Sequence, residues 1–355
     1  MSKKILITGS GGLIGSEAVE HFANLGYEVV GIDNNMRKEF FGEKGDTSWR
    51  VEQLKNKWKD KFIPQSVDIR KRDALENVFA NTRFDAIIHC AAQPSHDKAK
   101  DIPFDDFDVN AVGTLNLLEM TRRFCSESPF VFMSTNKVYG DAPNEIDMRE
   151  METRYEYEKY PYYKEGIDES MRIDNSKHSI FGASKVAADI MVQEYGKYFG
   201  MKTAVLRGGC LTGPNHSGVE LHGFLSYLIK VAVSGGTYKV FGYKGKQVRD
   251  NIHSYDVVRA MEEIINNPKS GGPAYNIGGG YANSVSILEV FHKLKNLYGI
   301  KVKWEYIDQN RSGDHICYYT NNKKLKEAYP NWDVTVSIDR IIVEMVIAET
   351  NMKNK

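Results

Sequence analysis

Cysteine is scarce, and the few cysteines are not arranged to bind a metal or to pair. The 355 residues include four, far apart and without a Cys-x-x-Cys pair: Cys90, Cys125, Cys210 and Cys317. This spacing argues against a disulfide framework and against a thiolate zinc site. We therefore expect no bound metal and a reducing compartment.

Long apolar runs are also lacking. No segment approaches the roughly 20 consecutive apolar residues that a membrane-spanning helix needs. Near the N-terminus, two lysines precede only three apolar residues, Ile5, Leu6 and Ile7, before a glycine turn begins. That run is too short for the core of a signal peptide. We expect a cytoplasmic protein with no membrane partner.

A net charge is absent as well. The chain has 47 Lys and Arg against 47 Asp and Glu, so its overall charge does not favour nucleic acid as a partner. Ten prolines and 30 glycines are too few for a disordered or fibrous chain, whereas 41% hydrophobic and 26% charged residues are typical of a globular protein. At roughly 150 residues per domain, the length predicts two domains or one intertwined α/β unit.

The sequence does contain a regular alternation of short apolar runs and helical patterns. Residues 4–8 and 27–33 are predicted strands, and residues 16–25 between them have helical spacing. Further strands are predicted at 62–67, 86–90, 130–134 and 203–207, with helices at 72–80, 111–123 and 184–199. The alternation predicts the α/β class, with a Rossmann-type doubly wound parallel sheet. A polar helix at 49–60 and a tyrosine-rich insertion at 141–177 interrupt it.

A glycine turn follows the first predicted strand. Gly9, Gly12 and Gly15 lie between strand and helix, where the absence of Cβ atoms lets the backbone approach a pyrophosphate. The free N–H groups and the positive dipole of the helix N-terminus attract the same anion. In a βαβ context this pattern predicts a dinucleotide site.

An acidic residue at the end of the second strand indicates which dinucleotide binds. Asp33 lies 18 residues after Gly15, where a carboxylate can accept hydrogen bonds from both ribose hydroxyls. A 2′-phosphate would be repelled there, so the cofactor is predicted to be NAD. Arg37 and Lys38, which follow closely, count against that preference.

Several motifs occur in the order that one family shows. They are the glycine pattern, Asp68-Ile69, Ala91-Ala92-Gln93, Asn110 in Asn-Ala-Val-Gly-Thr-Leu-Asn, residues 138–140 (Val-Tyr-Gly) and residues 247–250 (Gln-Val-Arg-Asp). From about residue 3 to about residue 340 the chain resembles the extended short-chain dehydrogenase/reductase family, the NAD-dependent epimerases and dehydratases. The resemblance implies these NAD-binding residues: Gly9, Gly12, Leu13, Ile14, Gly15, Asp33, Asn34, Asp68, Ile69, Ala91, Ala92, Gln93, Asn110 and Lys185.

The resemblance also implies how the chain is divided. Residues 1–206, with a return segment near 250–278, would form the NAD-binding domain. Residues 207–249 and 279–345 would form a smaller, intertwined nucleotide-sugar-binding domain. A homodimer is implied too, through the predicted helices at 111–123 and 184–199.

Within the family, residues 134–141, 152–155 and 245–250 are most similar to the CDP-paratose 2-epimerase (CDP-tyvelose 2-epimerase) group. This implies an isomerase that inverts C2 of a nucleotide sugar, through a transient 2-keto sugar and enzyme-bound NADH, in O-antigen or capsule biosynthesis. A cytidine nucleotide follows from the resemblance alone, because no residue spacing encodes a base.

The family's active site combines a Ser or Thr with Tyr-x-x-x-Lys, in which the tyrosine transfers a proton. Thr135 and Lys185 match, but Phe181 occupies the tyrosine position, and a phenyl ring cannot transfer a proton. Loss of a positioned acid/base typically costs about 10²–10⁴-fold in rate.

Three explanations of Phe181 stay open. In the first, a substitute transfers the proton: His96 beside Asp97, Lys137, or a tyrosine of the insertion such as Tyr163. Alternatively, Phe181 is an engineered replacement of tyrosine, or the chain binds a nucleotide sugar without turning it over.

The expected substrate contacts come mostly from the C-terminal half. They are Asn136, Lys137, Asn215, His216, Tyr238, Arg249 and Arg311, of which the two arginines would bind the diphosphate. A 4-epimerase, a synthase or a dehydratase of the same fold is the alternative. A dehydratase commonly has an Asp-Glu pair after the active Thr, whereas Asn136 and Lys137 follow Thr135 here.

Overall fold

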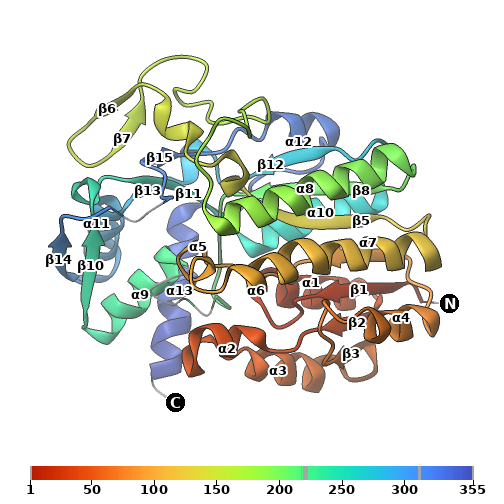
Figure 1. Ribbon diagram of the computed structural model, residues 1–355. Coiled ribbons are helices and arrows are strands. Elements are labelled where there is room, and N and C mark those ends of the chain that lie inside the picture. Colours follow the sequence, from red (N-terminus) through yellow and green to blue (C-terminus); the bar gives the residue numbers. More distant parts are fainter. Residues whose placement is uncertain (1, 217, 219–222, 311–312, 354–355) are drawn as a thin grey trace.

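The computed structural model describes residues 2–216, 218, 223–310 and 313–353. Its centre is a seven-stranded sheet in which every neighbouring pair is parallel (Figure 1). The strand order is β12 (Ala274–Ile277), β8 (Thr203–Gly208), β5 (Phe130–Thr135), β4 (Ala86–His89), β1 (Lys4–Thr8), β2 (Glu28–Ile32) and β3 (Phe62–Gln65). The predicted doubly wound parallel sheet is confirmed.

Helices cover both faces of this sheet, which explains why its central strands are apolar throughout. On one face lie α1 (Leu13–Asn24), α3 (Ser48–Trp58) and α10 (Ser254–Asn266); on the other lie α4 (Arg72–Ala80), α7 (Gly113–Phe124) and α8 (Ile180–Tyr198). Each face has its own apolar core, with Ile7 and Phe22 buried in the first and Leu6 and Leu117 in the second. The alternation of strand side chains therefore divides one sheet between two cores.

Most predicted elements form within a few residues of their expected bounds. The predicted helix at 72–80 is α4, and the polar helix at 49–60 is α3. The helix predicted at 184–199 begins four residues earlier, because Ser179 caps it: its Oγ accepts a hydrogen bond of 3.1 Å from Gly182 N. This extension places Phe181 and Lys185 one turn apart on the same helix.

The helix predicted at 111–123 also begins earlier than expected. A π-helical turn over Asp108–Val112 precedes α7 and continues into it. Two short helices lead into it from β4, α5 (His96–Ala99) and α6 (Pro103–Phe107).

The chain leaves the large sheet after β8 and returns to it at β12. The segments between and after these strands form a second group of strands. One sheet of this group contains β9 (Cys210–Thr212), β11 (Val248–His253), β13 (Ser284–Ser286) and β15 (Cys317–Tyr318). The other pairs β10 (Thr237–Phe241) with β14 (Lys303–Ile307). Around them lie α9 (Phe224–Ser234), α11 (Ile287–Tyr298) and α13 (Ile338–Lys353), which share a third apolar core (Figure 1). Helix α12 (Lys323–Ala328) packs back on β12.

The insertion at 141–177 begins with a 3-10 helix over Ala142–Glu145 and continues into the hairpin of β6 (Met148–Glu150) and β7 (Tyr155–Tyr157). Tyr157 is fully buried, and its hydroxyl donates a hydrogen bond of 2.6 Å to Cys317 O in β15. The insertion is therefore packed onto the second group of strands. Within the described ranges, every helix is too short or too polar to span a lipid bilayer.

A buried ion pair links β8 to the helix that carries Phe181 and Lys185. The Arg207 guanidinium donates to both oxygens of Asp189, at 2.8 and 3.0 Å, and Asp189 also accepts a hydrogen bond of 2.7 Å from Ser134 Oγ. Asp189 is fully buried and Arg207 nearly so. Removing one partner would leave a desolvated charge without compensation.

We expect Asp189→Ala to lower the free energy of unfolding by about 3–5 kcal/mol, because Arg207 then stays buried and unpaired. Glu194→Ala is the matched control, since the Glu194–Lys197 pair on the same helix is half exposed and should contribute less than about 1 kcal/mol. Urea unfolding followed by circular dichroism measures both. Equal losses for the two variants would contradict this interpretation.

Candidate active site

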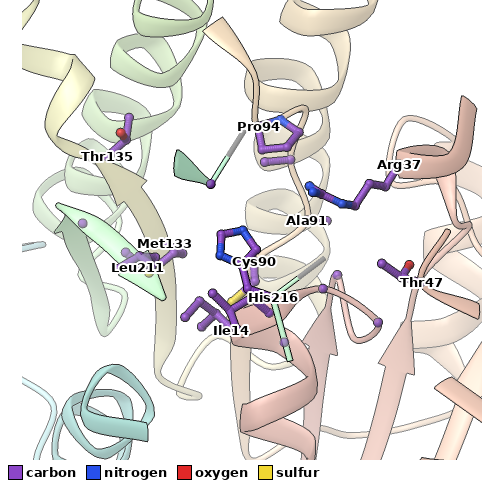
Figure 2. Close-up of a pocket in the computed structure, with 18 of the residues that line it drawn as sticks. Ile14, Arg37, Thr47, Cys90, Ala91, Pro94, Met133, Thr135, Leu211 and His216 are labelled. Carbon is purple, nitrogen blue, oxygen red and sulfur yellow. The ribbon is translucent and has the colours of Figure 1, made fainter. Parts of the chain in front are cut away.

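A cavity of about 370 Å³ lies where the carboxyl ends of β1, β2, β4, β5 and β8 meet segments from the C-terminal half. This is the edge at which doubly wound sheets bind their ligands. Figure 2 shows Arg37 and Thr47 on one side of the cavity, and Met133, Thr135 and Leu211 on the other.

The glycine turn forms one wall of the cavity, and its backbone leaves no room for side chains. Gly9 has a φ of 71°, and a Cβ on it would lie 2.8 Å from Ala91 N. A Cβ on Gly15 would lie 2.0 Å from Gly9 O. Because α1 begins at Leu13, directly after the turn, its first N–H groups lie at the cavity. This is a cradle for a pyrophosphate.

Asp33 stands beside that turn at the end of β2. Its carboxylate accepts hydrogen bonds of 2.8 Å from Gly11 N and from Asn35 N. Burial raises the pKa of Asp33, although these two hydrogen bonds favour the ionised form. Each carboxylate oxygen retains lone-pair capacity for a ribose hydroxyl. The glycine cradle and this carboxylate together fit a dinucleotide.

Further along the same wall, Asp68 and Ile69 line the cavity, as do Leu13, Ile14, Asn34, Ala91 and Ala92. Burial disfavours ionisation of Asp68, but hydrogen bonds from Arg70 outweigh it and lower the pKa of Asp68. Asp68 is therefore held as an anion.

Gln93 and Asn110 are not among the described residues that line the cavity, so their expected contact with the cofactor stays a prediction. Gln93 Nε2 donates 2.7 Å to Asp106, and Asn110 Nδ2 donates 3.1 Å to Ser184 Oγ. Ser184 in turn donates 2.5 Å to Asp106. This buried network joins the loop after β4 to the first turns of α8. The two residues support the wall from behind.

The structure brings Thr135, Phe181 and Lys185 to one end of the cavity. Lys185 Nζ donates 2.8 Å to Met133 O and lies 4.1 Å from the centre of the Phe132 ring. Burial lowers the pKa of Lys185 to about 8. Phe181 is 7% exposed, and its apolar ring occupies the position at which the family has the catalytic tyrosine. No described group replaces it on that helix turn.

Of the proposed substitutes, His96 and Lys137 line the cavity and Tyr163 does not. His96 Nδ1 lies 3.5 Å from Asp97 Oδ1. The Tyr163 ring contacts the Arg149 guanidinium and the Lys164 ammonium within the insertion. Because it is absent from the cavity lining, Tyr163 is the weakest of the three candidates.

The expected substrate residues divide into two groups. Asn136, Lys137, Asn215 and His216 line the cavity. Burial, with a smaller contribution from Arg37, lowers the pKa of His216 to about 3, so its imidazole is neutral.

Two expected substrate residues are not among the described residues that line the cavity, and their roles stay predictions. Tyr238 is buried in the core formed by α9, β10 and α11. Arg249 donates 2.5 Å to Asp314 and 2.7 Å to Val248 O. Arg311 lies outside the described residues.

Sequence reasoning missed several lining residues from the segment between β2 and β3. Helix α2 (Met36–Phe41) and the start of α3 fold back onto the glycine turn, so that Met36 and Thr47 line the cavity. A Cβ on Gly11 would lie 3.1 Å from Thr47 Oγ1. Only the polar helix pattern signalled this segment, and it carries no ligand-binding motif. Among the described residues, no group of three or more His, Cys, Asp or Glu side chains is placed to hold a metal.

We expect Gly15→Ala to weaken NAD binding at least tenfold, because its Cβ would displace Gly9 and the helix N-terminus. The matched control is Gly236→Ala, which is not among the residues that line the cavity and whose Cβ would come no closer than 3.3 Å to any neighbour, Val231 Cγ1 being the nearest. Calorimetric titration with NAD, after removal of any copurified cofactor, measures both. Wild-type affinity in Gly15→Ala would show that the turn does not hold the cofactor.

Comparison with known proteins agrees with this geometry. The model of the NAD dependent epimerase/dehydratase family matches residues 5–278. CDP-paratose 2-epimerase of Salmonella typhi is 32% identical over 94% of this chain and 95% of its own, and UDP-glucuronate 4-epimerase of Thermodesulfobacterium geofontis is 27% identical over 94% and 92%. The solved UDP-glucuronic acid 4-epimerase of Bacillus cereus, in complex with UDP-glucuronic acid and NAD, superposes with a TM-score of 0.80 at 22% identity, covering 98% of this chain and 99% of that one.

These matches cover most of the chain. The family model includes all the described residues that line the cavity, of which Asn251 is the last in sequence. The chain belongs to the NAD-dependent epimerase/dehydratase family, and its cofactor is NAD.

Proposed function

We propose that this chain is a nucleotide-sugar 2-epimerase of the CDP-paratose 2-epimerase type. The observation that carries the proposal is the 32% identity to such an enzyme along nearly the whole of both chains. The cavity supports it, because one space is bordered by the dinucleotide cradle and by Thr135, Lys137 and Lys185. A sugar bound between these groups would have its C2 beside the cofactor.

NAD, when bound, accepts the hydride of C2 and returns it to the opposite face of the 2-keto sugar. The chain's residues have the other tasks. The glycine turn and Asp33 orient the cofactor, and Thr135 offers a hydroxyl at the end of β5 for a sugar oxygen. The walls exclude water, which keeps the reactive ketone enclosed until the hydride returns.

The two residues after Thr135 argue against net dehydration. Loss of water needs an additional acid and base near the reacting carbons, and an Asp-Glu pair commonly supplies them. Asn136 and Lys137 occupy those positions on the cavity wall, and neither is a carboxylate. A 4-epimerase remains the alternative, since it needs the same cofactor chemistry at a different carbon.

We expect the purified chain to invert C2 of a CDP-linked deoxyhexose without consuming added NAD. Proton NMR of incubations with CDP-, GDP- and UDP-linked hexoses and deoxyhexoses identifies the carbon inverted and the preferred base. Phe181→Tyr is run in parallel. Inversion at C4 alone would contradict the assignment, whereas inversion only by Phe181→Tyr would identify the chain as a disabled form.

We also propose that the chain is a homodimer through α7 and α8, which lie side by side on one face of the sheet (Figure 1). Apolar side chains remain exposed there, including Ile190, Met191 and Tyr198 on α8 and Phe104 on α6. Exposed apolar surface of this kind often marks a protein interface.

Light scattering should therefore give twice the mass of one chain, and the double variant Ile190→Glu with Tyr198→Glu should give the mass of one. Trp304→Glu, on β14 in the other half of the molecule, changes an apolar side chain about as exposed as Ile190 (47% against 43%) and should leave the mass unchanged. A wild-type monomer, or a dimer that persists in the α8 variant, would exclude this interface.

A further inference from the structure

Phe181 leaves the proposed reaction without its usual proton carrier. When hydride leaves C2, the proton of the C2 hydroxyl must pass to another group and later return. The described titratable residues that line the cavity limit the choice. Asp33, Arg37 and Asp68 lie at the glycine-turn end, and burial raises the pKa of Cys90 and of Cys210 to about 12. Burial lowers the pKa of His216 to about 3, too low for it to hold a proton near neutral pH.

Three groups remain at the Thr135 end: His96, Lys185 and Lys137. Lys185 is directed toward the sheet, because its Nζ donates to Met133 O and lies over the Phe132 ring. The charges that act on it, from Asp189, Cys90 and Asp106, also belong to the large sheet and its helices. This places the Lys185 amine on the cofactor side of the cavity.

Lys137 lies beside the active threonine and beside the helix turn that carries Phe181 in the tyrosine position. Its backbone N donates 3.2 Å to Thr135 Oγ1, on the wall that Thr135 and Met133 share in Figure 2. A Cβ on Gly182, the residue after Phe181, would lie 2.9 Å from Lys137 O. Lys137 is therefore packed between the active threonine and the helix turn from which a tyrosine would project.

Burial favours the neutral amine of Lys137, and the charges around it offset that effect only in part. Asp314 is the carboxylate that acts on Lys137 most strongly, and its Oδ1 is bound by Arg249 at 2.5 Å, whereas Lys137 Nζ is 3.9 Å from the same oxygen. Arg249 therefore shares this carboxylate with Lys137, and its own positive charge favours the neutral amine. Burial, partly offset by Asp314, lowers the pKa of Lys137 to about 8.

The neutral amine has the capacity that the reaction needs. It donates one N–H to Gly313 O, at 2.8 Å, and still has a lone pair to accept a proton. A proton carrier works best when its pKa is near the working pH, because both protonation states are then populated.

We propose that Lys137 replaces the missing tyrosine as the proton carrier of the epimerisation, which rests on the function proposed above. As the C2–H bond breaks and its hydride passes to NAD, the O2–H bond breaks and its proton passes to Lys137 Nζ, which becomes an ammonium. The C2–O bond becomes a carbonyl. When the hydride returns to the other face, the ammonium returns the proton to O2, so atoms and charges balance.

Lys137→Arg is the sharpest test, because it keeps the positive charge but cannot release a proton at any working pH. We expect Lys137→Arg and Lys137→Ala alike to lower the rate of C2 inversion about 10²–10⁴-fold. Calorimetric binding of CDP should stay within threefold of wild type. Lys100→Ala, an exposed lysine at the end of α5, is the matched control and should keep full activity.

Two rescues separate a proton carrier from a structural lysine. Ethylamine added to Lys137→Ala should restore part of the rate, in proportion to its unprotonated fraction. Phe181→Tyr should also restore activity in the Lys137→Ala background, because it supplies the phenol. A Lys137→Arg variant with more than a tenth of wild-type activity, or the absence of both rescues, would overturn the proposal.

The pH profile gives an independent readout. The rate should rise through pH of about 8 as Lys137 loses its proton, and then level off. The charged and titratable groups that act on Lys137 are Asp314, Arg249, Cys210, Asp97 and His315, with His96 acting through Asp314. Asp314→Asn removes the one close anion, so it should move the rise to lower pH. A rise unmoved in Asp314→Asn would contradict the role of Lys137.

NMR of the protein with [13Cε]-lysine provides a readout that does not depend on activity. The signal that disappears in Lys137→Ala should titrate near pH 8, and titration at pH 10 or above would overturn the proposal. Full activity of Lys137→Ala would remove this inference alone. Failure of the wild-type chain to invert C2 of any nucleotide sugar would remove the proposed function and this inference together.

Discussion

The close approach of α1 to the turn after β1 is the constraint on which the rest of the site depends. A single added methyl group on Gly15 would lie 2.0 Å from Gly9 O, and one on Gly9 would meet the backbone of Ala91 at the end of β4. Strand, helix and neighbouring strand therefore meet at one point. Asp33 is tied to the same turn through Gly11 N. A pyrophosphate bound to the helix N-terminus is thereby placed at the edge where the remaining strands end.

The opposite end of the cavity depends on charge balance. Two buried lysines, Lys137 and Lys185, face one space, and burial lowers the pKa of each to about 8. Their carboxylate neighbours have other strong partners: Arg249 binds Asp314, and Arg207 binds Asp189. Burial outweighs the attraction of these carboxylates, so both amines can lose their protons near pH 8, which suits a reaction that moves one proton and one hydride.

Much of the fold could be predicted because its signals are local. Apolar runs and glycine positions predicted six of the seven strands of the large sheet and the turn after β1, but not β12. The family resemblance indicated Thr135, Phe181 and Lys185, which the structure brings to one cavity. The π-helical turn before α7 and the earlier start of α8 were missed, since they depend on the packing around Asn110 and on the Ser179 cap.

The partners of buried polar groups could not be predicted. Arg249 and Asp314 are 65 residues apart in sequence, and no pattern joins them before the chain folds. The same holds for the network of Gln93, Asp106 and Ser184, and for Thr47 at the glycine turn. Gln93, Asn110 and Arg249 bind other buried groups and are not among the described residues that line the cavity. A motif gives a residue's position along the chain but not its hydrogen-bond partner.

The most direct test of the account is the fate of the hydrogen on C2. The wild-type chain is incubated with its nucleotide sugar in D2O, and the epimerised product is examined by NMR and mass spectrometry. Transfer of hydride to enclosed NAD and back predicts inversion at C2 with no deuterium on carbon. Deuterium at C2 of the product would mean that C2 exchanges its hydrogen with solvent, and it would contradict the hydride mechanism.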